Sequence, residues 1–256
     1  MIKKIPQTSI IIAYYKKKHF FEETVNSILN QTYSDFEVIL VYDDVDKKEL
    51  NFVKKILSRL PRYKIIINKK NIGAGLSRNK AIYFAKGQYI AFCDADDLWH
   101  KKKLEVQITF MKQEKINFSH TSYKIINNFG NTLGYFKIAK KLNYKDLLKS
   151  CDIATSSVVI NKNILKKGIF FSNFTTKEDY ALWLKIAKKE NKLYGIKNDL
   201  LFWRSLHNSL SDSFFQKLFD AYKVYRFSEK YNTITSIYFV IRLSLFALIK
   251  KIDMYR

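Results

Sequence analysis

The chain has 256 residues, of which 47% are hydrophobic, so it can bury the core of one large domain or of one domain with an appendage. Seven glycines and two prolines exclude a long flexible linker, and the sequence contains no repeat or low-complexity tract. The formal net charge of +23 favours anionic partners, but the lysines are scattered along the chain, so composition alone identifies no partner.

The first half alternates short apolar runs with amphipathic stretches. Residues 9–13 form a β-branched run that predicts a strand, and apolar residues then recur at helical spacing from Phe21 to Leu29. Two further strands, residues 36–41 and 63–67, are each followed by a helical stripe. A fourth strand is predicted at residues 89–93. Near-continuous apolar strands separated by helices indicate a mainly parallel sheet with helices on both faces.

Polar groups follow these strands at the points where they end. Tyr14 comes after the first, Asp43 and Asp44 after the second, and three carboxylates at residues 94–97 after the fourth. In such sheets, ligands bind beyond the carboxyl ends of the strands. Crowded carboxylates are tolerated where a cation offsets their charge, and an acidic turn that caps the next helix is the alternative. A nucleotide diphosphate bound through a metal ion fits this rim.

Four segments, taken in order, resemble the family 2 glycosyltransferases: residues 9–16, 36–44, 71–79 and 87–99. The resemblance covers about residues 8–212. It implies the GT-A fold, a Rossmann-like α/β fold for nucleotide-diphospho-sugar transferases, and transfer with inversion. The expected organisation is a GT-A domain over residues 1–212 and a C-terminal helical extension over residues 213–256. A dinucleotide-binding fold is disfavoured because its third glycine position is held by Arg78.

The same resemblance assigns roles around the nucleotide sugar. Asp43 or Asp44 would bind the nucleobase, commonly uracil, and Asp94 would lie near the ribose. Asp96, the second aspartate of the DxD motif, would coordinate Mn²⁺ or Mg²⁺ through the diphosphate. The complete predicted set for the nucleotide sugar is Ala13, Tyr14, Asp43, Asp44, Arg78, Asp94, Ala95, Asp96 and Arg204.

The second half is expected to supply the base. Apolar residues at 182, 183, 186 and 187 predict a helix whose first turn holds Glu178 and Asp179. Acidic residues there interact favourably with the helix dipole, which is a sufficient structural reason for them. Displacement at an anomeric carbon, however, requires a carboxylate that accepts the acceptor hydroxyl's proton. The resemblance places Asp179 in that base position, with Glu178 beside it.

Other side chains of the second half have predicted roles in the acceptor and leaving-group sites. Residues 155–160 read as a strand that resembles the family segment on the acceptor side. Residues 203–211 resemble the family's terminal loop, in which Arg204 would counter the leaving group's charge and His207 would assist on phosphate or metal. His120 is a lone histidine in a strand, typical of a structural residue, with catalysis or metal binding as the alternative. The predicted acceptor-side residues are Asp97, Trp99, Ser156 and Trp183.

The tail is apolar almost all round from residue 234 to residue 249. Sixteen helical residues reach about 24 Å, short of the roughly 30 Å hydrocarbon core, and Arg242 lies inside the run. The pattern therefore favours a helix that lies in the plane of an anionic membrane surface. Packing on the domain or on a second subunit is the alternative.

Together these features predict an inverting, metal-dependent glycosyltransferase. Its donor would be a nucleotide-diphosphate sugar, with a UDP-sugar favoured, and its acceptor a glycan or lipid-linked glycan in surface-polysaccharide or lipooligosaccharide synthesis. Cys93 and Cys151 have no metal or redox spacing, and no signal peptide is recognisable, so a cytoplasmic location, peripheral on the inner membrane, is expected.

Two other functions compete with this prediction. A nucleotidyltransferase that makes activated sugars would need a glycine-rich loop after the first strand, where the chain has Tyr14, Tyr15 and Lys16. A nucleic-acid-binding module would use the charge and the 16% aromatic content, but the basic residues are dispersed and no recognised motif occurs, so no nucleic acid is expected.

Overall fold

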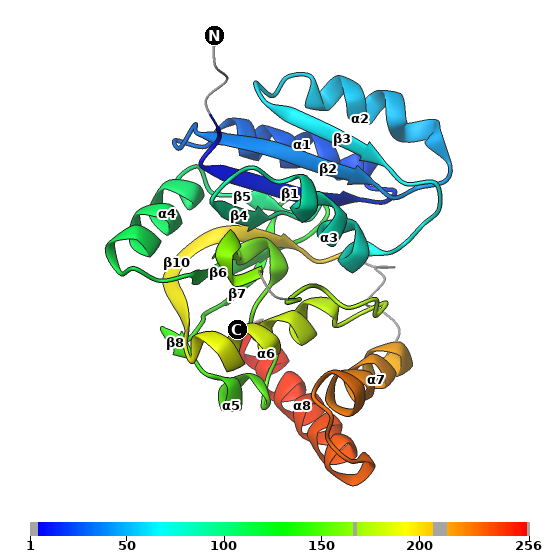
Figure 1. Ribbon diagram of the computed structural model, residues 1–256, viewed down its shortest axis with the longest axis vertical. Coiled ribbons are helices and arrows are strands. Elements are labelled where there is room, and N and C mark those ends of the chain that lie inside the picture. The colour runs from blue at the N-terminus through cyan, green and yellow to red at the C-terminus, as the bar shows by residue number, and fades with distance from the viewer. Residues whose placement is uncertain (1–4, 166–167, 207–213, 255–256) are drawn as a thin grey trace.

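The computed structural model describes residues 5–165, 168–206 and 214–254. Within these residues the strands form one ten-stranded sheet in the order β3-β2-β1-β4-β9-β6-β10-β5, with β7 paired to β6 and β8 to β10 (Figure 1). The strands are β1 (Thr8–Tyr14), β2 (Phe36–Tyr42), β3 (Tyr63–Ile67), β4 (Tyr89–Phe92), β5 (Leu98–Trp99), β6 (Phe118–Ile126), β7 (Thr132–Phe136), β8 (Lys141–Leu142), β9 (Val159–Asn161) and β10 (Leu193–Arg204).

Helices cover both faces of this sheet, as the periodicity predicts. They are α1 (Lys18–Leu29), α2 (Leu50–Leu57), α3 (Ala74–Phe84), α4 (Lys103–Gln113), α5 (Tyr144–Leu147), α6 (Glu178–Glu190), α7 (Phe214–Lys223) and α8 (Thr233–Met254). Short helical turns also occur at η1 (Lys47–Glu49), η2 (Thr155–Ser157), η3 (Lys162–Leu165) and η4 (Val224–Ser228).

The four predicted strands of the first half pair in parallel, with β1 between β2 and β4 and with β3 at the edge. The second half is mixed, because β9 lies antiparallel between β4 and β6, whereas β6 and β10 are parallel. The strand order reverses at β1. Ligands bind at such a reversal in open α/β sheets, so the ends of β1 and β4 are the expected place for a site.

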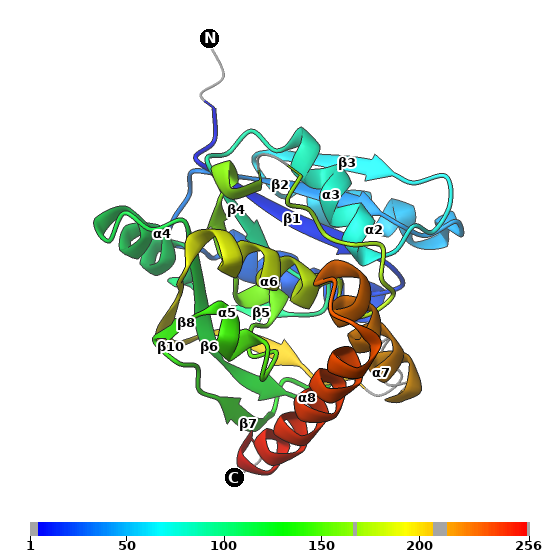
Figure 2. The ribbon, with the colours of Figure 1, turned by 60° about the horizontal axis from the view of Figure 1, so that its bottom comes forward.

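Two hydrophobic clusters flank the sheet because successive strand residues point to opposite faces. Ile10 and Ile12 pack with α1, α2 and α4, whereas Ile11 packs with α3 and α6 on the other face. Figures 1 and 2 show these helices on the two sides of the strands. This double covering explains why the strands read as continuous apolar runs.

Two segments differ from the sequence prediction. The strand expected at residues 155–160 begins only at Val159, because Thr155–Ser157 form a helical turn in which the Ser157 hydroxyl donates to the carbonyl of Ala154 at 2.6 Å. The twelve-residue strand β10 was not predicted at all. It pairs along β6 and on its other side with β5 and β8, so it is stabilised by neighbours distant in sequence.

The C-terminal helices lie together at the end of the molecule away from the N-terminus (Figure 1). They pack on α6, where the hydroxyls of Tyr180 and Tyr225 lie 2.8 Å apart and Leu243 joins the core cluster. The Thr176 backbone N–H donates to Asp220 at 2.9 Å. The predicted boundary between residues 212 and 213 falls outside the described residues.

Candidate active site

The centre of the candidate site is a buried arginine held between two carboxylates. Arg78 lies on α3 and is 5% exposed. Its guanidinium donates to Asp94 after β4 and to Glu178 at the start of α6, each at 2.7 Å. Arg78 and Glu178 are one hundred residues apart in sequence. This double ion pair therefore brings the turn after β4 and the N-terminus of α6 to one rim.

A glycine makes this approach possible. A Cβ at Gly75 would lie 2.6 Å from the carbonyl oxygen of Ser172 and 2.9 Å from Cγ of Glu178. The first turn of α3 thus packs directly against the segment that leads into α6. Any side chain at this position would force Ser172 or Glu178 to move.

The predicted base lies beside this pair. Helix α6 begins after Lys177, which has a φ of 64°, and Asp179 is in the first turn. The Asp179 carboxylate accepts hydrogen bonds from the hydroxyl of Thr155 at 2.8 Å and from the backbone N–H of Tyr180 at 2.7 Å. Its side chain is only partly buried. Thr155, which the sequence prediction did not single out, fixes the orientation of this carboxylate.

Glu178 differs from its neighbour in being buried. Burial and the charge of Asp179 raise its pKa to about 7, whereas the ion pair with Arg78 acts in the opposite direction. The Glu178 side chain is only 11% exposed in its ion pair with Arg78. Glu178 therefore positions Arg78, and Asp179 is the carboxylate of the pair that is open toward solvent.

The turn after β4, residues 94–97, contains the DxD motif and is called the DxD turn. Other groups of the fold only partly offset the charge of its carboxylates. Burial and Asp94 raise the pKa of Asp96, although Lys17 lies 2.7 Å from its Oδ2 and lowers it. Burial and Asp96 raise the pKa of Asp97, and Asp97 Oδ2 has no hydrogen-bond partner among the described residues. A site with this surplus of hard oxygen donors suits a divalent cation. The ammonium of Lys17, which no sequence signal identified, already accompanies Asp96.

Protein groups alone do not complete a metal site in the described chain. No group of three or more histidine, cysteine, aspartate or glutamate side chains is arranged there to hold an ion. The predicted ligand His207 lies outside the described residues. A cation at Asp96 would therefore need oxygens from a bound diphosphate.

The two candidates for the nucleobase contact have different surroundings. Asp43 accepts hydrogen bonds from the side chain of Asn68 and from the backbone N–H groups of Ile72 and Gly73, at 2.8 to 2.9 Å. Its carboxylate is thus committed to the loop that precedes α3. Asp44 accepts only the N–H of Asp46, at 3.1 Å, among the described contacts. Asp44 is therefore the candidate whose carboxylate can still accept a hydrogen bond from a nucleobase.

Three further residues of the predicted nucleotide set are partly or fully buried. Ala13 is partly buried at the end of β1. The Tyr14 side chain is buried and donates its hydroxyl to Glu49 at 2.6 Å, and its predicted place in the nucleotide site stays a prediction. Ala95 is buried, and its carbonyl accepts a hydrogen bond from Thr24 at 3.1 Å.

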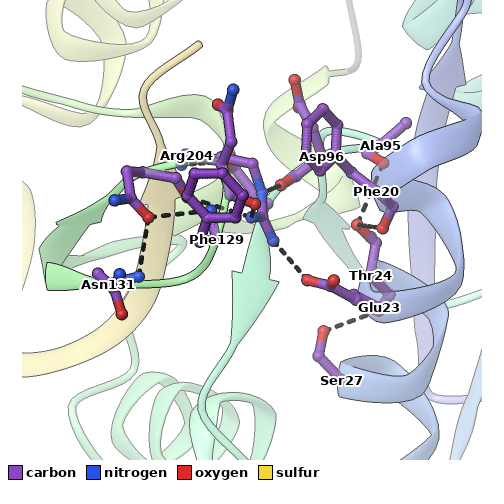
Figure 3. A network of polar contacts seen from close by, with 12 residues as sticks. Phe20, Glu23, Thr24, Ser27, Ala95, Asp96, Phe129, Asn131 and Arg204 are labelled. Atoms are coloured by element: carbon purple, nitrogen blue, oxygen red, sulfur yellow. Dashed lines mark hydrogen bonds and ion pairs between the residues drawn. The ribbon is translucent and has the colours of Figure 1, made fainter.

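Arg204 holds a structural network together in this fold, and its predicted contact with the leaving group stays a prediction. Figure 3 shows its guanidinium inside a network with Glu23 and with the carbonyl of Asp96. It also donates to the carbonyls of Asn127 and Asn128 and lies over the ring of Phe20. The side chain is 0% exposed, and these contacts join β10, α1, the DxD turn and the turn after β6.

The residues predicted on the acceptor side are all buried, and their contact with an acceptor stays a prediction. Trp183 packs among Phe92, Phe118 and Phe171 in the core. The other three position the DxD turn: Ser156 Oγ accepts the N–H of Asp94 at 2.9 Å, Trp99 donates to the Ser156 carbonyl at 3.0 Å, and Asp97 accepts the N–H of Arg204 at 2.9 Å.

His120 fits the structural interpretation. It is completely buried in β6, and neither ring nitrogen has a partner among the described residues. Burial lowers its pKa to about 3, so the ring is neutral at physiological pH.

Comparison with known sequences gives the family and two curated relatives. Residues 9–169 match the model of Glycosyl transferase family 2. A β-1,3-glucosyltransferase of Escherichia coli, WfgD, described as using UDP-Glc and α-D-GlcNAc-diphosphoundecaprenol, is 39% identical over 183 residues, which are 72% of this chain and 70% of WfgD. The putative teichuronic acid biosynthesis glycosyltransferase TuaG of Bacillus subtilis is 34% identical over 229 residues, or 88% and 89% of the two chains.

Solved structures show the same GT-A fold. S. aureus TarS 1–349 in complex with UDP-GlcNAc has a TM-score of 0.73 at 20% identity, over 91% of this chain and 70% of that one. The mannosyltransferase PcManGT of Pyrobaculum calidifontis, solved with GDP-Man and Mn²⁺, has a TM-score of 0.67 at 13% identity, over 93% and 70%.

Proposed function

The chain belongs to glycosyl transferase family 2, and we propose from this premise that it transfers a hexosyl group from a UDP-sugar to a lipid-linked glycan. The enzyme class is that of its relatives, so neither the nucleotidyltransferase nor the nucleic-acid-binding alternative is needed. The donor proposed first is UDP-glucose, because WfgD is described as using it. The acceptor class, a glycan on a diphosphate lipid carrier, is proposed on the same ground.

One observation supports this function most directly. Arg78 is paired with both Asp94 and Glu178, so the turn after β4 and helix α6, which carries Asp179, lie at one rim of the sheet. A nucleotide sugar bound beyond β1 and β4 would have Asp44 within the same rim for its base. The anomeric carbon would then lie between the diphosphate and Asp179.

In the proposed reaction, Asp179 accepts the proton of an acceptor hydroxyl. The hydroxyl oxygen forms its bond to the anomeric carbon on the face opposite the diphosphate. The bond between that carbon and the diphosphate oxygen breaks, and UDP leaves with the electron pair. Configuration is inverted because the two bonds lie on opposite faces.

We further propose that Asp96 holds Mn²⁺ or Mg²⁺ together with the diphosphate. Such an ion would neutralise charge on the leaving group. The ion pair between Asp96 Oδ2 and the ammonium of Lys17 supports this assignment, because it shows that a positive charge can lie beside this oxygen. Since a lipid-linked acceptor is confined to a membrane, we place the protein on the cytoplasmic face of the inner membrane.

The test is transfer from UDP-glucose to a short-chain GlcNAc-diphosphate-lipid, with GDP-mannose as the alternative donor. Asp179→Asn should lower turnover by about 10² or more, the scale of general-base loss, while UDP still stabilises the protein in thermal unfolding. Asp199→Asn is the matched control, because Asp199 on β10 pairs with the exposed Lys137, which follows β7, and this variant should keep full turnover. Full activity in Asp179→Asn, or no transfer from any donor by folded wild type, would overturn the proposal.

A further inference from the structure

The outward side of α8 is apolar, which is unusual for a helix at a protein surface. Seven of its large side chains are between 48% and 82% exposed. At 100° per residue they occupy an arc of about 120° along one side of the helix. We call this side the α8 apolar face; it consists of Ile234, Ile237, Tyr238, Ile241, Leu245, Leu248 and Ile249.

This face is large for a monomeric soluble protein. At roughly 200 Å² for each large side chain, these exposed fractions amount to several hundred Å², whereas the largest apolar patch of a typical monomer is roughly 300–600 Å². Phe215 and Phe219 on α7 and Phe227 after it are also exposed, at 82%, 56% and 64%. A surface of this kind marks a site of contact with another molecule or with lipid.

From residue 214 to residue 250, the charge that faces solvent has one sign. Between residues 214 and 250 the acidic residues are Asp220 and Glu229, and both side chains are 0% exposed. Each is paired with a lysine. The basic residues of the stretch are Lys217, Lys223, Arg226, Lys230, Arg242 and Lys250. The C-terminal helices therefore present apolar and cationic groups together, which complements an anionic lipid surface.

Helix α8 is held flat along the protein. Near its beginning Phe239 stacks on Tyr225, with ring centroids 5.2 Å apart, and Leu243 in the middle is buried. Toward its end, Lys250 donates to the hydroxyl of Ser150 at 2.8 Å and pairs with Asp152. By length and composition residues 233–250 could cross a bilayer. A spanning helix, however, would lose all of these contacts and would place Arg242 in hydrocarbon.

We propose that the α8 apolar face seats this protein on an anionic lipid bilayer, with the helix axis in the membrane plane and the basic residues near the headgroups. The opposite side of the same helix packs on η4, which in turn contacts α6 through Tyr225 and Tyr180, so seating would hold the helix that carries Asp179 near the membrane (Figure 2). The proposal stands on the surface itself and does not depend on which sugar is transferred.

The test is cosedimentation of the full chain with vesicles, without any sugar substrate. Vesicles of equal parts phosphatidylcholine and phosphatidylglycerol should bind the protein, more weakly as salt rises, and phosphatidylcholine alone should bind it less. The double variant Ile241→Asp, Leu245→Asp should lower binding at least tenfold, and it should fold because both side chains are 56% exposed. Tyr83→Asp on α3, with 82% exposure, is the matched control and should bind as wild type does.

A second variant keeps the test valid if the double variant does not fold. Lys230→Gln removes one exposed cation and should weaken binding to the anionic vesicles about fivefold. Sedimentation equilibrium tests the alternative that a second copy of the chain covers the α8 apolar face. A wild-type dimer that the double variant dissociates, with no vesicle binding by either protein, would overturn the proposal and assign the face to a second copy of the chain. Because no transfer is measured, failure here leaves the proposed enzymatic function untouched.

Discussion

Replacing Arg204 by methionine tests whether this residue stabilises the fold or binds the leaving group. Its guanidinium donates to Glu23 at 2.6 Å and to three backbone carbonyls at 2.9 to 3.2 Å, and the side chain is fully buried. Methionine retains the apolar stem and loses every one of these contacts. The loss leaves three backbone carbonyls without this donor, and at about 1–3 kcal/mol for each unsatisfied buried acceptor it costs about 3–5 kcal/mol. With a melting shift of about 2–4 °C per kcal/mol for a chain of this size, Arg204→Met should melt about 10 °C lower.

Differential scanning calorimetry on Arg204→Met and Arg59→Met gives the comparison. Arg59 forms an ion pair with Glu22 in which both side chains are about half exposed, at 44% and 55%. Its loss should therefore change stability by less than about 1 kcal/mol. If Arg204→Met melted with the wild type but lost affinity for UDP, the structural assignment would be refuted and the contact with the diphosphate restored.

Three further changes test other parts of the molecule. Burial lowers the pKa of Lys103 to about 7 from 10.5, so the native state binds fewer protons than the unfolded chain between these values. Wild-type stability therefore rises with pH, and the advantage of Lys103→Met in urea unfolding should shrink by roughly 4 kcal/mol from pH 7 to pH 10.5; an unchanged difference would contradict this. Gly75→Ala should lower the melting temperature, because the added Cβ meets Glu178 at 2.9 Å, although alanine normally stabilises a helix by about 1 kcal/mol. Lys17→Met should raise Mn²⁺ affinity of the nucleotide-free protein roughly fivefold in a paramagnetic resonance titration, since the ammonium no longer competes for Asp96; equal affinities would exclude that competition.

Much of the fold could be predicted from local sequence pattern. The apolar runs that became β1, β2 and β4 are buried on both faces, and helical spacing identified α1, α2 and α3 between the first four strands. The same reasoning failed for β10, whose interior carries Lys197, Asn198 and Asp199 and interrupts any apolar run. That strand exists because β6 pairs with it along its length, a neighbour that local periodicity does not reveal.

The candidate site divides in a similar way. Strand-end carboxylates and the first turn of α6 could be located in advance, because the carboxyl ends of parallel strands meet at one edge of a sheet. The hydrogen-bond partners of these side chains could not be predicted from the sequence. Arg204 and Trp183 are residue types that often occur in functional sites. In this structure, however, Arg204 donates to backbone carbonyls, and Trp183 is enclosed by aromatic rings. Lys17 reaches Asp96 only because the loop after β1 lies beside the turn after β4.

The sequence by itself determined the α/β alternation and the family, and it indicated the region proposed to carry the chemistry, since each depends on order and spacing along the chain. The tertiary structure alone decided which polar side chains remain open to a ligand. That choice depends on which donors and acceptors a buried group meets, and in this protein those partners come from segments as far apart as α1 and β10. It also decided that the apolar residues of α8 face outward, because only one side of that helix has a core to pack against.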